Sequence, residues 1–307
     1  MKIFNNFKIS KKFKRSSLAV GNFDGVHKGH QKVFKYAKSK KSKFGILTFS
    51  PLPVMFFNKK IKNYRLASED EKFRLLKKFG VDFVVNIKFN KTFSKITAEN
   101  FIKNIIYKKI NPKNVFVSNN FKFGNKRAGN VKLLKKFENK YDYRLFKINP
   151  YKYKKKIVSS TRIRKFLQSG NIKLANKLLS RTWLIDGIVI KGKKIGRKLG
   201  YRTCNINIKN YVLPKSGIYA VRVMIENTKM YQGVAYLGSR PTFSGKEIFL
   251  EINIFGIKKN LYRKKLRVYF VKFIRIDKKF QSSLALVKQM NKDVILAKKG
   301  LKGNILI

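Results

Sequence analysis

The sequence predicts an α/β domain built on a parallel sheet, followed by a mainly β barrel domain that ends in a helix. Up to about Ser180, short apolar runs alternate with longer stretches whose apolar residues recur at helical spacing, which is typical of a parallel sheet covered by helices. After Trp183 the pattern changes to β-rich runs separated by Gly, Pro, Asn and Lys, which indicates a small barrel. A chain of 307 residues has room for two such domains.

The apolar periodicity divides each half into elements. In the first half we expect strands at residues 18–20, 44–49, 83–87 and 115–117, and helices at 31–41, 69–79, 98–107 and 131–138. In the second half the expected strands are 185–190, 218–225, 233–236, 249–255 and 266–274. A closing helix over 278–298 would bury a stripe of apolar side chains, namely Phe280, Leu284, Leu286, Val287 and Met290.

The net charge of +60 admits two interpretations. Such a charge suggests a nucleic-acid partner, because phosphate backbones attract Lys and Arg without reading sequence. The Lys residues are, however, scattered through the chain together with abundant Asn, Ile, Phe and Tyr, as expected where A- and T-rich codons dominate. We favour this drift of surface residues, because binding segments concentrate their basic residues on one face or in one tail. A weak, salt-sensitive affinity for nucleic acid follows in either case, without a specific nucleic-acid partner.

The single cysteine and the lack of long apolar runs indicate a cytoplasmic protein. The chain has one cysteine, Cys204, so it can form neither an internal disulfide nor a zinc cluster, and a reducing compartment fits. Residues 1–14 lack an apolar run of signal-peptide length, and no later stretch approaches the ~20 apolar residues of a membrane span. We therefore expect no membrane partner.

The two histidines of the chain both lie in the segment GNFDGVHKGH, residues 21–30. A strand precedes this segment, its glycines permit a tight turn, and a helix follows from about Gly29. Such a turn aims backbone N–H groups and a helix N-terminus at an anion, and His27 and His30 can add donors to a triphosphate. The alternative is that the histidines merely cap or pack. A metal pair is disfavoured, because no third Cys or His ligand is available.

This segment resembles the HxGH-type signature of the adenylyltransferase superfamily, in the form found in bacterial bifunctional riboflavin kinase/FMN adenylyltransferases (FAD synthetases). SSTRIR at 159–164 resembles the second superfamily motif, and GNIKLA at 170–175 follows it as in the family. The resemblance implies a Rossmann-like nucleotidyltransferase domain whose motifs hold ATP through Gly21, Phe23, Asp24, Gly25, His27, Gly29, His30, Ser160, Thr161 and Arg164. Hydroxyls and a guanidinium near a helix start suit oxyanions, although an ordinary helix cap with a surface Arg would look the same.

Two shorter matches lie between these motifs. FSPLP at 49–53 resembles a loop that follows the second strand in the family, and NFKFG at 120–124 resembles its flavin-side motif. The second match implies that Asn120 and Phe121 bind flavin. Ser118 and Lys122 stand where Gly and Arg are common.

The second half resembles the riboflavin kinase signature of the same family. The resemblance implies that this domain is a barrel of the six-stranded type. The match runs from Gly187 to Asn205 and continues at 217–221, 233–238 and 240–243. It implies a kinase site for ATP at Gly192, Gly196, Arg197, Thr203 and Asn205, with Thr203 and Asn205 as Mg²⁺ ligands, for which hydroxyl and amide oxygens are suitable.

Glu251 falls on the catalytic glutamate of the family. The kinase chemistry requires a carboxylate there, to deprotonate the ribityl hydroxyl that attacks the γ-phosphate of ATP. Taken by itself, a Glu in an alternating strand would be interpreted as part of the solvent-exposed face of that strand. The ordered series of matches favours the interpretation of Glu251 as the catalytic base. Four departures also stand near the signature: Arg202 for Pro, Cys204 for Ala, Asn253 for His and Arg263 for Gly. Because proline would fix φ just before Thr203, we expect the kinase to work at a reduced rate.

The resemblance extends from about Ser17 to Val294 and implies two consecutive reactions. Residues 1–182 would form the FMN adenylyltransferase domain, and residues 183–307 the riboflavin kinase domain with its C-terminal helix. Riboflavin would be phosphorylated to FMN, and FMN adenylylated to FAD with release of pyrophosphate. Riboflavin, FMN and ATP are then the small-molecule ligands, and His27, His30 and Glu251 the catalytic residues. Two alternatives remain: an adenylyltransferase with an impaired kinase domain, and a basic nucleic-acid-binding protein on a retired enzyme fold.

Overall fold

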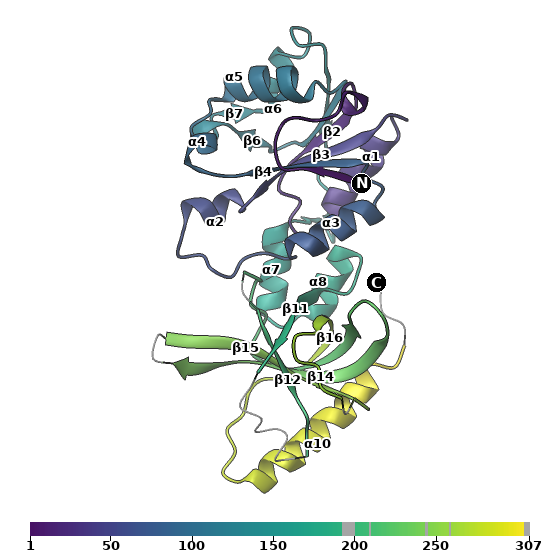
Figure 1. Ribbon diagram of the computed structural model, residues 1–307, viewed down its shortest axis with the longest axis vertical. Helices are drawn as coiled ribbons and strands as arrows, with labels where there is room; N and C mark the ends of the chain where they lie inside the picture. The colour runs from purple at the N-terminus through teal and green to yellow at the C-terminus, as the bar shows by residue number, and fades with distance from the viewer. Residues whose placement is uncertain (192–199, 209, 243–244, 258, 304–307) are drawn as a thin grey trace. The chain divides into compact units, whose positions relative to one another are not determined.

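The computed structural model shows two compact units (Figure 1). It describes residues 1–191, 200–208, 210–242, 245–257 and 259–303. Unit 1 consists of Met1–Lys62 and Glu69–Ser159, and unit 2 of Asn63–Ser68 and Ser160–Ile307. These units are defined by packing. The predicted boundary between Thr182 and Trp183 instead separates the segments expected to carry the two activities, and it stays a prediction.

Unit 1 is built on a sheet of six strands in the order β1-β4-β3-β2-β5-β8, in which every neighbouring pair is parallel. The predicted parallel sheet and its four expected strands are confirmed. Two edge strands were not predicted, because β1 is only three residues long and β8 has few fully buried side chains. The strands are β1 (Lys2–Phe4), β2 (Ser17–Val20), β3 (Phe44–Ser50), β4 (Phe83–Lys88), β5 (Asn114–Ser118) and β8 (Arg144–Ile148).

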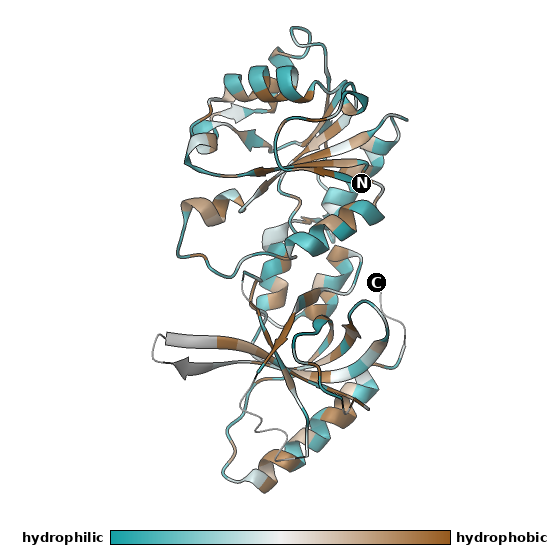
Figure 2. Ribbon diagram, viewed as in Figure 1, coloured by the Kyte–Doolittle hydropathy of each residue, from teal (hydrophilic) through white to brown (hydrophobic). Residues whose placement is uncertain are grey.

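Helices cover both faces of this sheet, since successive strand side chains point to opposite faces. Leu18 belongs to one hydrophobic core with η2 and α6, and the adjacent Ala19 to a second core with α1 and α3. Figure 2 shows the resulting hydrophobic strands between more hydrophilic helices. The helices are α1 (Lys28–Lys38), α2 (Pro53–Phe57), α3 (Glu69–Lys78), α4 (Lys91–Ser94), α5 (Ala98–Asn100), the π-helix η2 (Phe101–Ile110) and α6 (Val131–Lys136). Short elements complete the unit: η1 (Lys11–Phe13), η3 (Asn125–Arg127), β6 (Lys122–Phe123), β7 (Gly129–Asn130), β9 (Lys152–Tyr153) and β10 (Lys156–Ile157).

The strand order reverses at β2, which fixes the place of a ligand site. After β2 the chain continues to β3 and β4 on one side, whereas β5 and β8 lie on the other. In open α/β sheets, ligands bind outside the carboxyl ends of the strands at such a switch point. The histidine segment begins directly after Val20, the last residue of β2, and therefore stands at this position.

Unit 2 contains a closed barrel of six antiparallel strands in the order β11-β12-β15-β14-β13-β16. The predicted barrel is confirmed, and its strands are longer than their apolar runs suggest. The short strand β12 was not predicted, because polar asparagines alternate with its two buried side chains, Cys204 and Ile206. The strands are β11 (Leu184–Ile190), β12 (Cys204–Asn207), β13 (Gly217–Ile225), β14 (Met230–Thr242), β15 (Gly245–Ile254) and β16 (Lys265–Arg275).

Among the described residues of unit 2, three helices accompany the barrel: α7 (Ser160–Gln168), α8 (Ile172–Leu179) and α10 (Ser283–Gly300). The predicted C-terminal helix is confirmed, but its predicted stripe is wrong at Leu284, which is 69% exposed. The helix is buried near its other end, through Ala297 and Asp293. There the Arg275 guanidinium of β16 forms two bonds with Asp293, of 2.8 and 2.6 Å. This ion pair and the apolar contacts of Ala297 with the barrel both hold α10.

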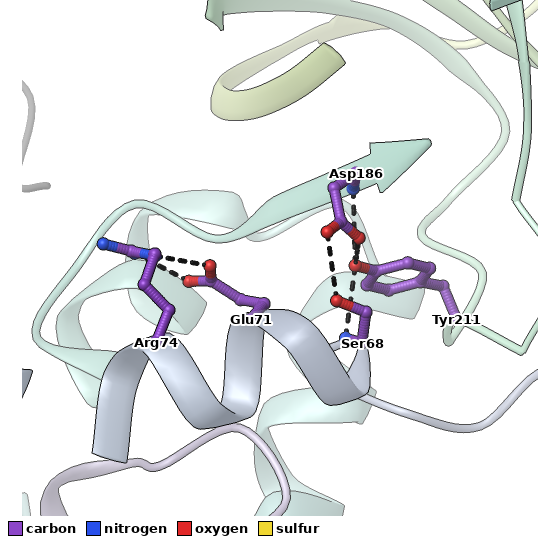
Figure 3. A network of polar contacts seen from close by, with 5 residues as sticks. All are labelled: Ser68, Glu71, Arg74, Asp186 and Tyr211. Atoms are coloured by element: carbon purple, nitrogen blue, oxygen red, sulfur yellow. Dashed lines mark hydrogen bonds and ion pairs between the residues drawn. The ribbon is translucent and has the colours of Figure 1, made fainter. Parts of the chain in front are cut away.

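The segment Asn63–Ser68 reaches unit 2 from within the first half of the sequence (Figure 3). The Ser68 hydroxyl donates to Asp186 Oδ2 at 3.1 Å, and the Ser68 N–H to the Tyr211 hydroxyl at 3.2 Å. Tyr211 in turn bonds the other oxygen of Asp186, and burial raises the pKa of Tyr211. Trp183 Nε1 donates to the Leu66 carbonyl at 2.8 Å. Figure 3 also draws an ion pair within α3 of unit 1, between Glu71 and Arg74.

Asp293→Asn should destabilise unit 2 by about 3–5 kcal/mol, because it leaves the buried Arg275 without its counter-charge. Denaturant unfolding followed by the fluorescence of Trp183, the only tryptophan, reports on this unit. Glu226→Gln is the matched control: its ion pair with Lys264 is about half exposed, so its loss should cost less than about 1 kcal/mol. Equal losses in the two variants would contradict a special role for the buried pair.

Candidate functional site

The turn that follows β2 has a backbone that few sequences can adopt. Phe23, Gly25 and Val26 have φ values of 48°, 78° and 41°, which lie in the left-handed region. For a β-branched residue such as Val26 this is an outlier, and strained conformations of this kind cluster at functional sites. The turn ends at His27, the N-cap of α1, so the start of the helix faces the carboxyl end of β2. A helix start of this kind can receive an anion, and the predicted anion site stays a prediction.

The two histidine rings lie against each other. Their centroids are 3.7 Å apart and their planes differ by 18°, with His27 buried and His30 half-buried. Gly29 makes room for this arrangement: a Cβ there would lie 3.0 Å from His27 Cε1 and 3.3 Å from the Val158 carbonyl oxygen. The edge of Phe23 supports His30 at a centroid distance of 5.2 Å. The structure therefore brings together the two side chains that the sequence singled out.

The second motif lies in unit 2, where α7 begins at Ser160. Ser160 and Thr161 are in the first turn of α7, as a helix-start interpretation requires, whereas Arg164 is buried. The Arg164 guanidinium lies 3.6 Å from the centroid of the Tyr64 ring, and its Nε donates to the Tyr64 carbonyl at 2.8 Å. The orientation of Arg164 is thus set by the segment Asn63–Ser68, a contact that the sequence gave no means to predict.

The kinase candidates meet on neighbouring strands of the barrel. Asn205 of β12 lies directly opposite Glu251 of β15, so both side chains stand on the same face. Thr203, just before β12, donates its hydroxyl to Glu251 Oε1 at 2.5 Å. A carboxylate, a hydroxyl and an amide oxygen thereby converge within one small region of unit 2. Gly192, Gly196 and Arg197, the other predicted kinase residues, lie outside the described residues.

Comparison with known proteins assigns both units. Residues 9–162 match the protein family described as FAD synthetase, and residues 179–301 the family described as riboflavin kinase. The bifunctional riboflavin kinase/FMN adenylyltransferase of Buchnera aphidicola from Schizaphis graminum is 40% identical, over 92% of this chain and 93% of its own length. The protein of the same name from Escherichia coli K12 is 33% identical, over 92% of this chain and 91% of its own length.

The chain belongs to the bifunctional riboflavin kinase/FMN adenylyltransferase family.

One solved structure also resembles the whole chain. It is described as a macrolide-efflux protein from Streptococcus pneumoniae, with a TM-score of 0.84 and 30% identity, covering 96% of this chain and 98% of its own. Within the part of the chain that the structure describes, no helix is long and apolar enough to cross a membrane. Family membership makes the protein an ATP-dependent enzyme of FMN and FAD formation, so the impaired-kinase and nucleic-acid-binding alternatives are not favoured.

The two residues predicted to bind flavin, Asn120 and Phe121, follow β5. Asn120 is exposed and accepts a bond from the Ser118 hydroxyl at 3.0 Å, and Phe121 stacks on Phe123 with centroids 5.4 Å apart. Ser118, where Gly is common in the family, thus orients Asn120. The flavin contact of Asn120 and Phe121 stays a prediction.

A cluster of aromatic side chains gathers at the carboxyl ends of β3 and β4. Its rings lie 5.3–6.0 Å from their neighbours, and one of them, Phe57, is 68% exposed. The sequence reasoning missed this cluster, although Phe49 begins the FSPLP match and two phenylalanines follow it in α2. Its members are Phe49, Phe56, Phe57, Phe89 and Phe93.

Two departures from the kinase signature are accommodated by local contacts. The Asn253 amide donates to the Arg202 carbonyl at 2.8 Å, so one replacement holds the backbone that the other has released from proline. Cys204 is buried, and burial raises the pKa of its thiol to about 12, so it remains a protonated, apolar side chain at neutral pH.

A pocket of about 470 Å³ opens beside Thr203 in unit 2. Its floor comes from inward-facing barrel residues such as Cys204 and Ile252, and residues 259–262 form another wall. The lining mixes apolar side chains with polar ones, among which are Arg202, Thr203 and Lys259. The pocket has the size of a small-molecule site.

Gly29→Ala should reduce FAD formation about 10- to 100-fold, because the new Cβ displaces the His27 ring or the Val158 carbonyl. Alanine favours a helix more than glycine does, so helix propensity cannot account for a loss. FMN formation by unit 2, measured in the same preparation, is the control and should stay unchanged. FAD formation within twofold of the parent would contradict the tight fit around Gly29.

Proposed function

We propose that the two reactions are performed by the two clusters that the structure assembles, one in each unit. In unit 1, the turn after β2 with His27 and His30 binds ATP and transfers its AMP to FMN. In unit 2, Glu251 with Thr203 and Asn205 transfers the γ-phosphoryl group of another ATP to riboflavin. The stacking of His27 on His30 at 3.7 Å, at the topological switch point of a parallel sheet, carries the first half of the proposal.

The adenylyl step needs alignment and charge neutralisation rather than a covalent intermediate. The FMN phosphate is the nucleophile at the α-phosphorus of ATP, and pyrophosphate leaves. His27 and His30 stand where their ring N–H groups can donate to oxygens on which negative charge grows, together with the amides of the turn. The contact of Ser160, Thr161 and Arg164 with the phosphates of ATP remains a prediction from the resemblance.

In the kinase step Glu251 accepts the proton of the ribityl hydroxyl. The bond from Thr203 fixes one carboxylate oxygen of Glu251 and leaves the other free to turn toward the substrate. Because the Thr203 hydroxyl donates its proton to Glu251, its lone pairs remain available, and with the Asn205 amide oxygen they form a hard-oxygen donor set that fits Mg²⁺. Bound there, Mg²⁺ would supply neutralisation of charge on the phosphates of ATP.

One pocket and one aromatic cluster support the assignment. The pocket beside Thr203 would accept the adenine base of the kinase ATP, since its volume is large enough for a base and it adjoins the metal-ligand candidate. In unit 1 the exposed ring of Phe57 and its neighbours offer flat apolar faces to the isoalloxazine ring of FMN.

We also propose a cytoplasmic location and small-molecule partners only. The single cysteine is a free thiol, as in a reducing compartment. The charge of +60 is distributed through the chain, so its nucleic-acid affinity would be weak, nonspecific and abolished by salt.

One reaction tests the proposal as a whole. The purified chain is incubated with riboflavin, ATP and Mg²⁺, and the flavins are separated by chromatography. FMN should accumulate first, at the reduced rate expected from Arg202, and FAD should follow. No FMN from riboflavin at saturating ATP would exclude the kinase half, and no FAD from supplied FMN would exclude the other half.

His30→Ala should lower FAD formation from FMN about 10²- to 10³-fold, because a donor to the departing pyrophosphate is lost. FMN formation from riboflavin should stay within about twofold of the parent. The measurement is initial rates of both products with one enzyme preparation. An equal loss of both activities would contradict two separate sites.

Glu251→Gln should lower FMN formation about 10²- to 10⁴-fold, because the amide cannot accept the hydroxyl proton. The rate of FAD formation from supplied FMN should be unaffected. Glu226→Gln, a half-exposed carboxylate of the same unit, is the matched control and should leave both rates intact. A Glu251→Gln enzyme that retains its kinase rate would rule out this base.

A further inference from the structure

A buried lysine lies behind the nucleotide turn of unit 1. Lys72 is only 6% exposed, and it shares the buried face of α3 with Leu75 and Leu76. Lysine is rarely buried unless its charge serves a purpose, because removing an ammonium group from water is costly. An apolar side chain at this position would continue the helical stripe. The position of Lys72 therefore calls for an explanation other than packing.

The hydroxyl group of Thr48 connects Lys72 to the turn. Its Nζ donates to Thr48 Oγ1 at 3.3 Å, and the fully buried Thr48 donates in turn to the Asn22 carbonyl at 3.1 Å. A hydroxyl has one proton to donate, so the bond from the ammonium group commits that proton to Asn22. A positive charge at the acceptor side of a hydroxyl also polarises it and strengthens its own donation.

This chain of bonds orients a peptide group of the turn. The carbonyl and N–H of a trans peptide point in opposite directions, so an Asn22 carbonyl held toward β3 aims the Phe23 N–H away from β3. The Phe23 N–H therefore points away from Thr48, and it belongs to the turn that follows β2 at the switch point. Among the described residues, the Phe23 N–H donates to no backbone carbonyl.

We propose that Lys72, acting through Thr48, is a positioning residue for ATP in the adenylyl reaction. It holds the Asn22–Phe23 peptide so that the Phe23 N–H faces a phosphate oxygen. The inference rests on the adenylyltransferase function of unit 1. It predicts an effect on ATP affinity that does not extend to FMN or to the kinase.

Four substitutions in the full-length protein separate the bond from the charge. Thr48→Val removes the hydroxyl at nearly constant shape, and Thr48→Ser restores it. Lys72→Met removes both donor and charge, and Lys72→Gln keeps a neutral donor. For each protein, the dissociation constant of ATP is measured by calorimetric titration, and KM for ATP, KM for FMN and kcat are measured for FAD formation. The kinase rate and the thermal unfolding temperature are recorded alongside.

Thr48→Val and Lys72→Met should weaken ATP binding and raise KM for ATP about tenfold, the effect of losing one hydrogen bond to a charged group, while KM for FMN changes less than about twofold. Thr48→Ser should restore ATP binding to within about twofold, and Lys72→Gln should fall between Lys72→Met and the parent. Kinase rates should be equal in all five proteins.

Thr48→Val with the same ATP affinity as Thr48→Ser would overturn the proposal. So would parallel rises in both KM values, or losses that follow the unfolding temperature, since these indicate a purely structural role. If the parent protein makes no FAD, the adenylyltransferase function fails, and the ATP dissociation constants still decide whether Lys72 and Thr48 position the nucleotide.

Discussion

The conformation of the turn after β2 is the constraint on which the adenylyl half depends. Three left-handed backbone positions within four residues reverse the chain between a buried strand and α1. Such a turn is costly in isolation, and it persists because β3 and α3 hold it from behind and the Phe23 ring packs beneath it. The turn thus brings the two histidine rings together beside the start of α1, at the anion site that we propose.

The kinase half uses a different solution to the same problem of placing oxygen atoms around phosphates. There the pairing of β12 with β15 brings Asn205 opposite Glu251, and the bond from Thr203 locks the carboxylate. A strand pair fixes side-chain spacing through its register, so no strained turn is needed. In the function that we propose, the two activities depend on separate structural features, one in each unit, so each reaction can serve as the control for the other.

The composition of the chain has less effect on these sites than its extreme charge suggests. The two units retain ordinary hydrophobic cores, and a buried ion pair between Arg275 and Asp293 secures the last helix. Even the departures from the kinase signature are matched to one another, since Asn253 holds the Arg202 carbonyl. The ion pair between Arg275 and Asp293 is formed by buried or half-buried groups, so surface lysines do not disturb it.

The sequence by itself determined the fold classes, the order of the two domains and the residues of both signature motifs, because apolar periodicity and glycine spacing are local properties of a chain. It could not determine that β12 forms a strand, since two apolar residues give no detectable period. Nor could it show that Tyr64 holds Arg164, that Phe57 and Phe89 share an aromatic cluster, or that Lys72 supports the nucleotide turn. These contacts join residues distant in the chain, and only the folded packing of strands and helices brings them together.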